Sequence, residues 1–149
     1  MVTTSMIIAT LGYASPDLAE TNTRAQALAE KTGNLGHLAE QIYGSFWAAI
    51  IAGNYPSGMA RADRLFGVAR RDGGAFTRGL ASSVQLISRF YIGDLLGTEE
   101  HFVSGEAFLS DRGLRRYSAA ARTLSYAGWN ARITGRPDEA RARMRRRHD

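Results

Sequence analysis

Apolar and charged stretches alternate along the chain, and their periods predict helices throughout. Three wide apolar runs each precede a charged amphipathic run, so helix pairs are expected over about residues 35–71, 76–110 and 114–148. Within these runs apolar residues recur at steps of three and four, and no segment shows the two-residue alternation of a strand. Another amphipathic stretch, over about residues 16–31, predicts one preceding helix. The pattern predicts an all-α chain of about seven helices.

Glycine-centred turns separate the paired helices. Gly53, Gly93 and Gly135 each lie between an apolar and a charged run, at spacings of 40 and 42 residues. A period of about 34 to 47 residues is typical of helical-repeat proteins, in which one hairpin cannot bury its apolar face alone. We therefore expect one domain over residues 1–149, a right-handed superhelical stack of antiparallel helical hairpins.

Local signals predict the helix boundaries. Ser15 precedes Pro16 and is expected to cap the first helix, because proline suits the first helical position. Thr98, followed by two glutamates, is expected to cap a helix over about residues 98–110. A single helix is expected over about residues 114–133.

The last hairpin resembles the tetratricopeptide repeat. The residues at matching spacings are Leu124, Ala127, Gly128, Ala131, Gly135, Asp138, Glu139, Ala140 and Met144. The resemblance implies that the small residues Gly128 and Ala140 let the paired helices touch and that Gly135 forms the turn. The earlier hairpins depart from the pattern, with Phe46 and Leu86 where Gly128 stands. The chain therefore resembles a set of divergent, TPR-like repeats.

A second resemblance extends from Gly12 to Arg143 and is to the repeat region of large bacterial signalling proteins. It is carried by Gly12-Tyr13-Ala14-Ser15-Pro16, Arg24-Ala25, Thr32-Gly33-Asn34, Phe90-Tyr91-Ile92-Gly93-Asp94, and Trp129 with Gly135-Arg136-Pro137-Asp138-Glu139-Ala140. In those proteins an output domain, often a nucleotide cyclase, precedes an AAA-type ATPase module and the repeats, and many are named adenylate cyclases. The resemblance implies that this chain is a fragment or relative of such a longer signalling protein, and that any cyclase or ATPase activity belongs to other domains.

Composition limits the chemistry. The 149 residues include no cysteine, so the chain can form neither a disulfide nor a thiolate metal site. The short apolar run at the N-terminus follows no positive charge, and no run approaches the roughly 18 residues of a membrane span. We expect a cytoplasmic protein without a membrane partner.

No catalytic pattern stands out. The only lysine, Lys31, precedes Thr32 but lacks the preceding glycine of a phosphate-binding loop. His37 shares a helical turn with Glu40, and His101 follows two glutamates, but these residues make a poor metal-ligand set without a further histidine or a cysteine. We predict no catalytic residue, no cofactor and no metal, and therefore no enzyme in this segment.

Positive charge is concentrated at the C-terminus. Residues 112–149 hold 11 basic and 3 acidic residues, whereas residues 1–111 hold 8 and 11. Candidate contacts to an acidic partner are Arg141, Arg143, Arg145, Arg146 and Arg147. One alternative is a small basic nucleic-acid-binding protein whose affinity falls steeply with salt. The other is a frayed helix end, since these arginines surround one helix and repel one another.

Aromatic residues supply the candidate partner groove. Trp47 and Trp129 each lie six residues before a turn glycine, with Ile87 at the matching place between them. In tetratricopeptide hairpins the first helix lines the concave surface, and the resemblance implies a peptide-binding groove lined by Tyr43, Trp47, Ile87, Tyr91 and Trp129. The same residues could instead form the core, or exposed repeat ends could pair in a homodimer. We expect a non-catalytic protein–protein interaction or regulatory scaffold, whose partner is another protein, a peptide or other domains of a longer chain.

Overall fold

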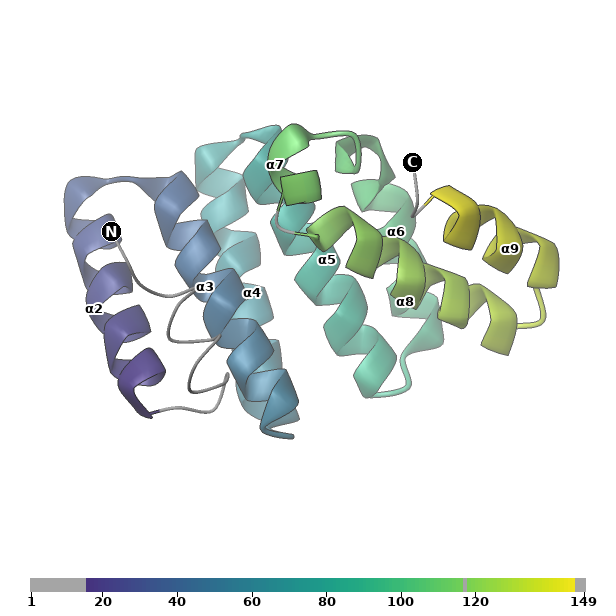
Figure 1. Cartoon of the computed structure of the whole chain (residues 1–149), viewed down its shortest axis with the longest axis horizontal. Coiled ribbons are helices and arrows are strands. Elements are labelled where there is room, and N and C mark those ends of the chain that lie inside the picture. The colour runs from purple at the N-terminus through teal and green to yellow at the C-terminus, as the bar shows by residue number, and fades with distance from the viewer. Residues whose placement is uncertain (1–15, 117, 147–149) are drawn as a thin grey trace. The chain divides into compact units, whose positions relative to one another are not determined.

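The computed structural model describes residues 16–116 and 118–146, and every regular element in these ranges is helical (Figure 1). The elements are α2 (Pro16–Thr32), α3 (Leu35–Ile51), α4 (Tyr55–Asp72), α5 (Ala75–Tyr91), α6 (Leu95–Gly105), the 3₁₀ turn η1 (Glu106–Phe108), α7 (Arg112–Arg116), α8 (Ala119–Ile133) and α9 (Pro137–Arg146). They form two compact units, unit 1 ending at Asp72 and unit 2 beginning at Gly73. The predicted all-α class is confirmed for the described residues, whereas the predicted cap Ser15 lies outside them.

One turn geometry joins helices at four places. Gly33, Gly53, Gly93 and Gly135 have φ angles of 69 to 80°, which glycine adopts without the steric penalty of a Cβ. In each turn the amide after the glycine donates to the carbonyl five residues earlier, as from Asn54 to Ala49 at 2.9 Å. This is the hydrogen bond of a Schellman motif, which ends one helix and reverses the chain.

The residue after the glycine also caps the next helix in three of these turns. The side chain of Asn34 accepts from the amide of His37 at 3.0 Å, and that of Asp94 accepts from Gly97 at 2.9 Å. Asn54 does the same for Ser57 at 3.2 Å. These acceptors satisfy amides at the helix start that have no partner inside the helix.

The prediction of Thr98 as a cap is wrong. Asp94 occupies the cap position, and α6 begins one residue later at Leu95. Thr98 is fully buried inside the helix, where its hydroxyl donates to the carbonyl of Asp94 at 2.8 Å. The glycine turn therefore starts the helix earlier than the threonine suggested.

In unit 1, α3 packs against both α2 and α4. Its buried residues include Leu38, Ile42 and Phe46, which have no exposed surface. Gly58 lets α4 lie close to α3, because an added Cβ would meet Ile50 Cδ1 at 2.8 Å. Arg64 of α4 binds the side-chain oxygen of Gln26 on α2 at 2.5 Å. Apolar contact and polar pairing together hold these three helices.

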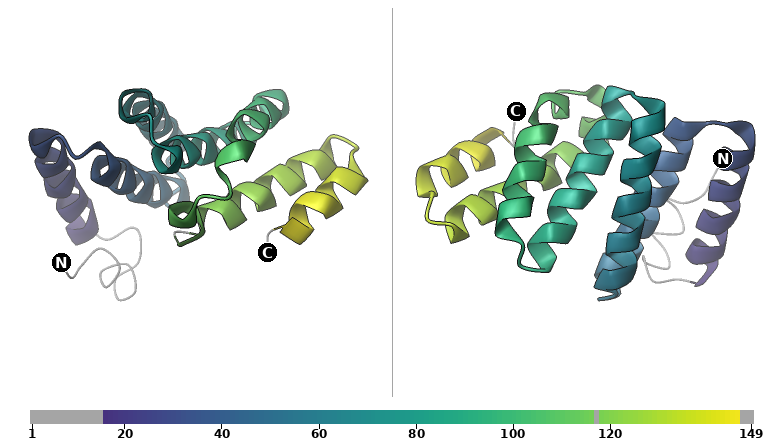
Figure 2. Two further views of the ribbon diagram at one scale, coloured as in Figure 1. Left: turned by 90° about the horizontal axis from the view of Figure 1, so that it is seen from above. Right: turned by 180° about the vertical axis from the view of Figure 1, so that it is seen from behind.

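In unit 2, α5 pairs with α6 and α8 pairs with α9, and α8 also packs on α5 and α6 (Figure 2). Small residues permit these contacts. A Cβ on Gly105 of α6 would lie 2.5 Å from the Cβ of Ser82 on α5, and a Cβ on Gly128 would lie 2.8 Å from Met144 Cε. Ala140 of α9 is buried, so the predicted close approach at Gly128 and Ala140 is confirmed.

The prediction of one helix over residues 114–133 is also wrong. α7 ends at Arg116 and α8 begins at Ala119, with Ser118 between them in the left-handed region at φ 56°. Leu114 of α7 is buried against Gly79 of α5, where an added Cβ would lie 2.2 Å from Leu114 Cδ1. A short helix is thus held on α5 before the chain turns into α8.

Candidate partner-binding surface

Four aromatic rings from α5 and α8 form one cluster in unit 2. Tyr126 lies at its centre, with ring centroids 5.3 Å from Phe90, 5.8 Å from Tyr91 and 4.9 Å from Trp129. The hydroxyl oxygens of Tyr91 and Tyr126 are 2.8 Å apart and share a hydrogen bond. We call Phe90, Tyr91, Tyr126 and Trp129 the aromatic face. Phe90 and Trp129 each pack edge-on against Tyr126, an arrangement that aromatic pairs favour, and Tyr91 is tilted towards it at 53°.

The aromatic face is partly open to solvent. Trp129 is 45% exposed and Tyr91 is 39% exposed, whereas Tyr126 is buried at 9%. Ile133 lies one helical turn beyond Trp129 on the same side of α8 and is 61% exposed. The surface therefore combines an aromatic base with exposed apolar side chains, as at protein interaction sites.

The five residues predicted to line one groove are divided between the units. In unit 1, Tyr43 and Trp47 are buried on α3 with their rings 6.3 Å apart. In unit 2, Ile87 is fully buried, while Tyr91 and Trp129 belong to the aromatic face. The core interpretation thus describes three of the five, and a single groove through all five stays a prediction.

Phe90 and Tyr126 belong to the aromatic face but are not among the residues predicted to line a groove. Tyr126 lies three residues before Trp129, and Phe90 is adjacent to Tyr91. The three-residue step along α8 was a usable signal, because residues at this spacing share a helix side. The contact between α5 and α8 had no such local signal.

A network of charged side chains connects α9 to α6. Both carboxylate oxygens of Glu99 on α6 accept from Arg143, and Arg136 Nη2 donates to Glu99 Oε2 at 2.8 Å. The hydrogen bonds from Arg143 are the main cause of a lowered Glu99 pKa, about 2; burial opposes the shift and Arg136 adds to it. The guanidinium of Arg143 also lies 4.1 Å from the ring centroid of Phe102.

Most of the arginines predicted to contact an acidic partner are engaged within the chain. Arg143 is 8% exposed and binds Glu99, while Arg141 pairs with Asp138 at 2.8 Å and Arg146 pairs with Glu106. Arg145 is exposed and has no ion pair within residues 16–116 and 118–146. Arg147 lies outside the described residues. α9 is thus anchored through its arginines and remains helical to Arg146.

Within residues 16–116 and 118–146, no group of three or more His, Cys, Asp or Glu side chains could hold a metal ion. The Nδ1 atom of His37 lies 3.4 Å from Glu40 Oε2 on the same helix. None of the described helices has the length and apolar character required to span a bilayer.

Comparison of the chain with protein-family models, with curated proteins and with solved structures finds no match. We therefore infer the function from the contacts inside each unit.

Proposed function

We propose that the chain is a non-catalytic protein-interaction scaffold whose TPR-like hairpins hold the aromatic face as a partner-binding surface. Three observations support this proposal: the recurring glycine turns, the close contact of Gly128 with Met144, and the packing of the α5–α6 pair on α8. Each is a feature expected of stacked hairpins. The right-handed superhelix is part of the proposal.

The observation that carries the proposal is the exposure of Trp129 on a rigid base. Trp129 is 45% exposed although its ring packs on Tyr126, and α8 beneath it is fixed by α5, α6 and α9. Tryptophan and tyrosine contribute a disproportionate share of binding energy at protein interfaces. A surface that is preorganised in this way costs little entropy on binding.

The biological context in the proposal comes from the resemblance to bacterial signalling proteins. The scaffold would then act as a regulatory module beside output and ATPase domains of a longer chain. We also propose that the chain forms a homodimer through an exposed face of its repeats. The nucleic-acid alternative receives less support, because Arg141, Arg143 and Arg146 are each paired with a carboxylate.

Selection of short displayed peptides on the immobilised full chain tests the proposal. We expect enriched peptides whose affinity falls by about 30-fold with Trp129→Ala, the effect of losing an interface hot spot. Val103→Ala is the matched control, since Val103 is a 63% exposed apolar residue on α6 of the same unit. Equal melting temperatures of the two variants would show that the fold is intact. Failure to enrich any peptide, or binding that ignores Trp129→Ala, would contradict the proposal.

A further inference from the structure

We infer that the aromatic face binds an acidic partner segment, a short peptide in which Asp or Glu side chains flank apolar anchor residues. This inference rests on the proposed function and adds the chemistry of the partner. It follows from the charges of the two helices that carry the aromatic face.

Those two helices contain no carboxylate side chain. α5 and α8 include Arg78, Arg89, Arg122 and Arg132 but no Asp or Glu. The imbalance extends to the whole of unit 2: residues 73–149 hold 13 basic and 8 acidic residues, whereas residues 1–72 hold 6 of each. The entire net charge of +5 therefore belongs to the unit that carries the aromatic face. A surface of this kind attracts acidic partners and repels basic ones.

Arg132 is the charge best placed to meet a partner carboxylate. It is exposed and lies three residues after Trp129, so the two side chains are neighbours on α8. Within the described part of the chain it has no ion pair, in contrast to Arg89, which pairs with Asp94 at 3.4 Å. A guanidinium can bind a carboxylate through two parallel hydrogen bonds. Trp129 and Arg132 thus offer an apolar contact and an ionic contact side by side.

The geometry of the rings favours a peptide over a single-stranded nucleic acid. Single-stranded nucleic acids stack their bases on separate aromatic platforms along a basic groove. Here Tyr126 meets Phe90 and Trp129 at interplanar angles of 77° and 76°, so the rings are packed against one another. Ile133, one helical turn after Trp129, adds an exposed apolar side chain on the same side of α8, and such a surface suits aliphatic and aromatic side chains.

A second copy of the chain is a poorer occupant of the same surface. A two-fold symmetric contact places the same patch of each copy against its counterpart. It would bring the carboxylate-free helices α5 and α8 of both copies together, so like charges such as Arg132 would repel across the contact.

The test uses three libraries of short displayed peptides on the immobilised full chain. Random apolar positions alternate with fixed acidic, neutral or basic residues, and a single-stranded oligonucleotide serves as a fourth ligand. We expect enrichment from the acidic library alone, with affinities that fall as salt is raised. Arg132→Gln should weaken the enriched peptides by about two- to five-fold, the effect of losing one exposed ion pair.

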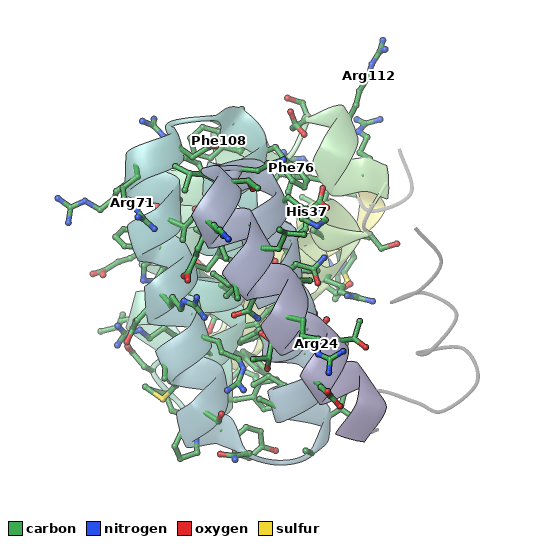
Figure 3. All side chains as sticks on the ribbon, turned by 90° about the vertical axis from the view of Figure 1, so that its left-hand side faces the viewer. Arg24, His37, Arg71, Phe76, Phe108 and Arg112 are labelled. Atoms are coloured by element: carbon green, nitrogen blue, oxygen red, sulfur yellow. The ribbon has the colours of Figure 1, made fainter. Side chains whose placement is uncertain are left out.

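Arg112→Gln is the matched control, because Arg112 is an exposed arginine of unit 2 that points away from the ribbon and has no ion pair within the described residues (Figure 3). This variant should bind the acidic peptides as the wild type does. Arg145→Gln on α9 should also leave binding unchanged.

Other outcomes would overturn the inference in distinguishable ways. Peptides that require Trp129 but come equally from the neutral or basic library would leave the proposed function standing and refute the acidic partner. Loss of binding with Arg145→Gln but not with Arg132→Gln would show that the partner's carboxylates contact α9 instead of α8. An oligonucleotide that competes with the peptides at equal affinity would show that the aromatic face binds nucleic acid. A dimer that is lost in Trp129→Ala would show that the face binds a second copy of the chain. No enrichment from any library would refute both proposals.

Discussion

The guanidinium of Arg143 on α9 binds both carboxylate oxygens of Glu99 on α6, with Nη1–Oε2 at 2.9 Å and Nη2–Oε1 at 2.5 Å. Arg143 Nη1 also donates to the carbonyl of Ala127 on α8 at 3.0 Å. One side chain therefore joins three helices of unit 2. Because Arg143 is 8% exposed, its charge requires compensation, which Glu99 provides together with Glu139 at 3.2 Å.

Removing one member of this pair should be costly. We expect Glu99→Gln and Arg143→Met each to lower the free energy of unfolding by about 2 kcal/mol, because each variant removes charge-assisted hydrogen bonds that are largely shielded from water. Glu106→Gln is the matched control, because the Glu106–Arg146 pair also joins α9 to an earlier element but is about half exposed. In urea unfolding, Glu106→Gln should lower the unfolding free energy by less than about 1 kcal/mol. Equal costs for the buried and exposed pairs would contradict this account of α9.

The same pair should make stability depend on pH in the acid range. The pKa of Glu99 is lowered from 4.5 to about 2, so its contribution is present above pH 4.5 and is lost as pH falls towards 2. The shift corresponds to at most about 3 kcal/mol, and solvent screening reduces this contribution because the Glu99 side chain is partly exposed. The difference in unfolding free energy between wild type and Glu99→Gln should therefore shrink over this window, as measured by thermal unfolding. A difference that stays constant down to pH 2 would exclude the ionic origin.

The turn glycines should resist substitution. Gly93 has φ 80°, so Gly93→Ala should lower the unfolding free energy by about 1–2 kcal/mol because a Cβ is strained in this region. Gly67 is the control, since it lies inside α4 with nothing within 4 Å of an added Cβ. Gly67→Ala should raise stability by about 0.5–1 kcal/mol. Chemical unfolding should therefore show changes in unfolding free energy of opposite sign for Gly93→Ala and Gly67→Ala. Changes of the same sign would contradict the turn geometry.

Close packing of α8 and α9 should appear as coupling between Gly128 and Met144. A Cβ on Gly128 would lie 3.2 Å from Met144 Cγ and 2.8 Å from its flexible Cε, so Gly128→Ala should lack the gain of about 0.5–1 kcal/mol expected of Gly67→Ala. In the double variant with Met144→Ala, the methyl group added at position 128 has room. Gly128→Ala should then be more favourable to the free energy of unfolding than it is beside Met144. A double-mutant cycle measures this coupling, which we expect to exceed about 0.5 kcal/mol. Additive effects would mean that the two side chains do not touch.

The two tryptophans should respond differently to a quencher. Trp47 is 9% exposed and Trp129 is 45% exposed. The emission of a Trp47→Phe variant, which reports on Trp129, should therefore lie further to the red and be quenched more strongly by acrylamide than that of Trp129→Phe. Reversed quenching would contradict the burial of Trp47 and the exposure of the aromatic face.

Much of the fold could be predicted from the sequence because its signals are local. Helical periodicity and the turn glycines at 53, 93 and 135 located most helices, and Gly128 with Ala140 located the contact of α8 with α9. The cap prediction at Thr98 is wrong because Asp94, directly after the turn glycine, is better placed to cap the helix. The break before α8 was missed because it depends on Leu114 packing against Gly79, a contact between segments far apart in sequence.

The candidate site was predicted only in part, for the same reason. The position of Trp129 before a turn glycine and the tetratricopeptide resemblance of the segment around Tyr91 indicate these two residues, but their shared neighbour Tyr126 follows from the packing of α5 on α8. The local sequence predicts Arg143 as a contact to an acidic partner, because nothing in it shows that Glu99, 44 residues earlier, lies opposite. Local charge counts cannot distinguish a solvated arginine from one that joins helices.

The most direct test of the central claim is the emission of Trp129 in the Trp47→Phe variant during titration with the acidic peptides recovered by selection. If the aromatic face is the binding surface, the emission should move to the blue and acrylamide quenching should fall as Trp129 becomes covered. Peptides that bind the chain while the emission and quenching of Trp129 stay unchanged would contradict the claim.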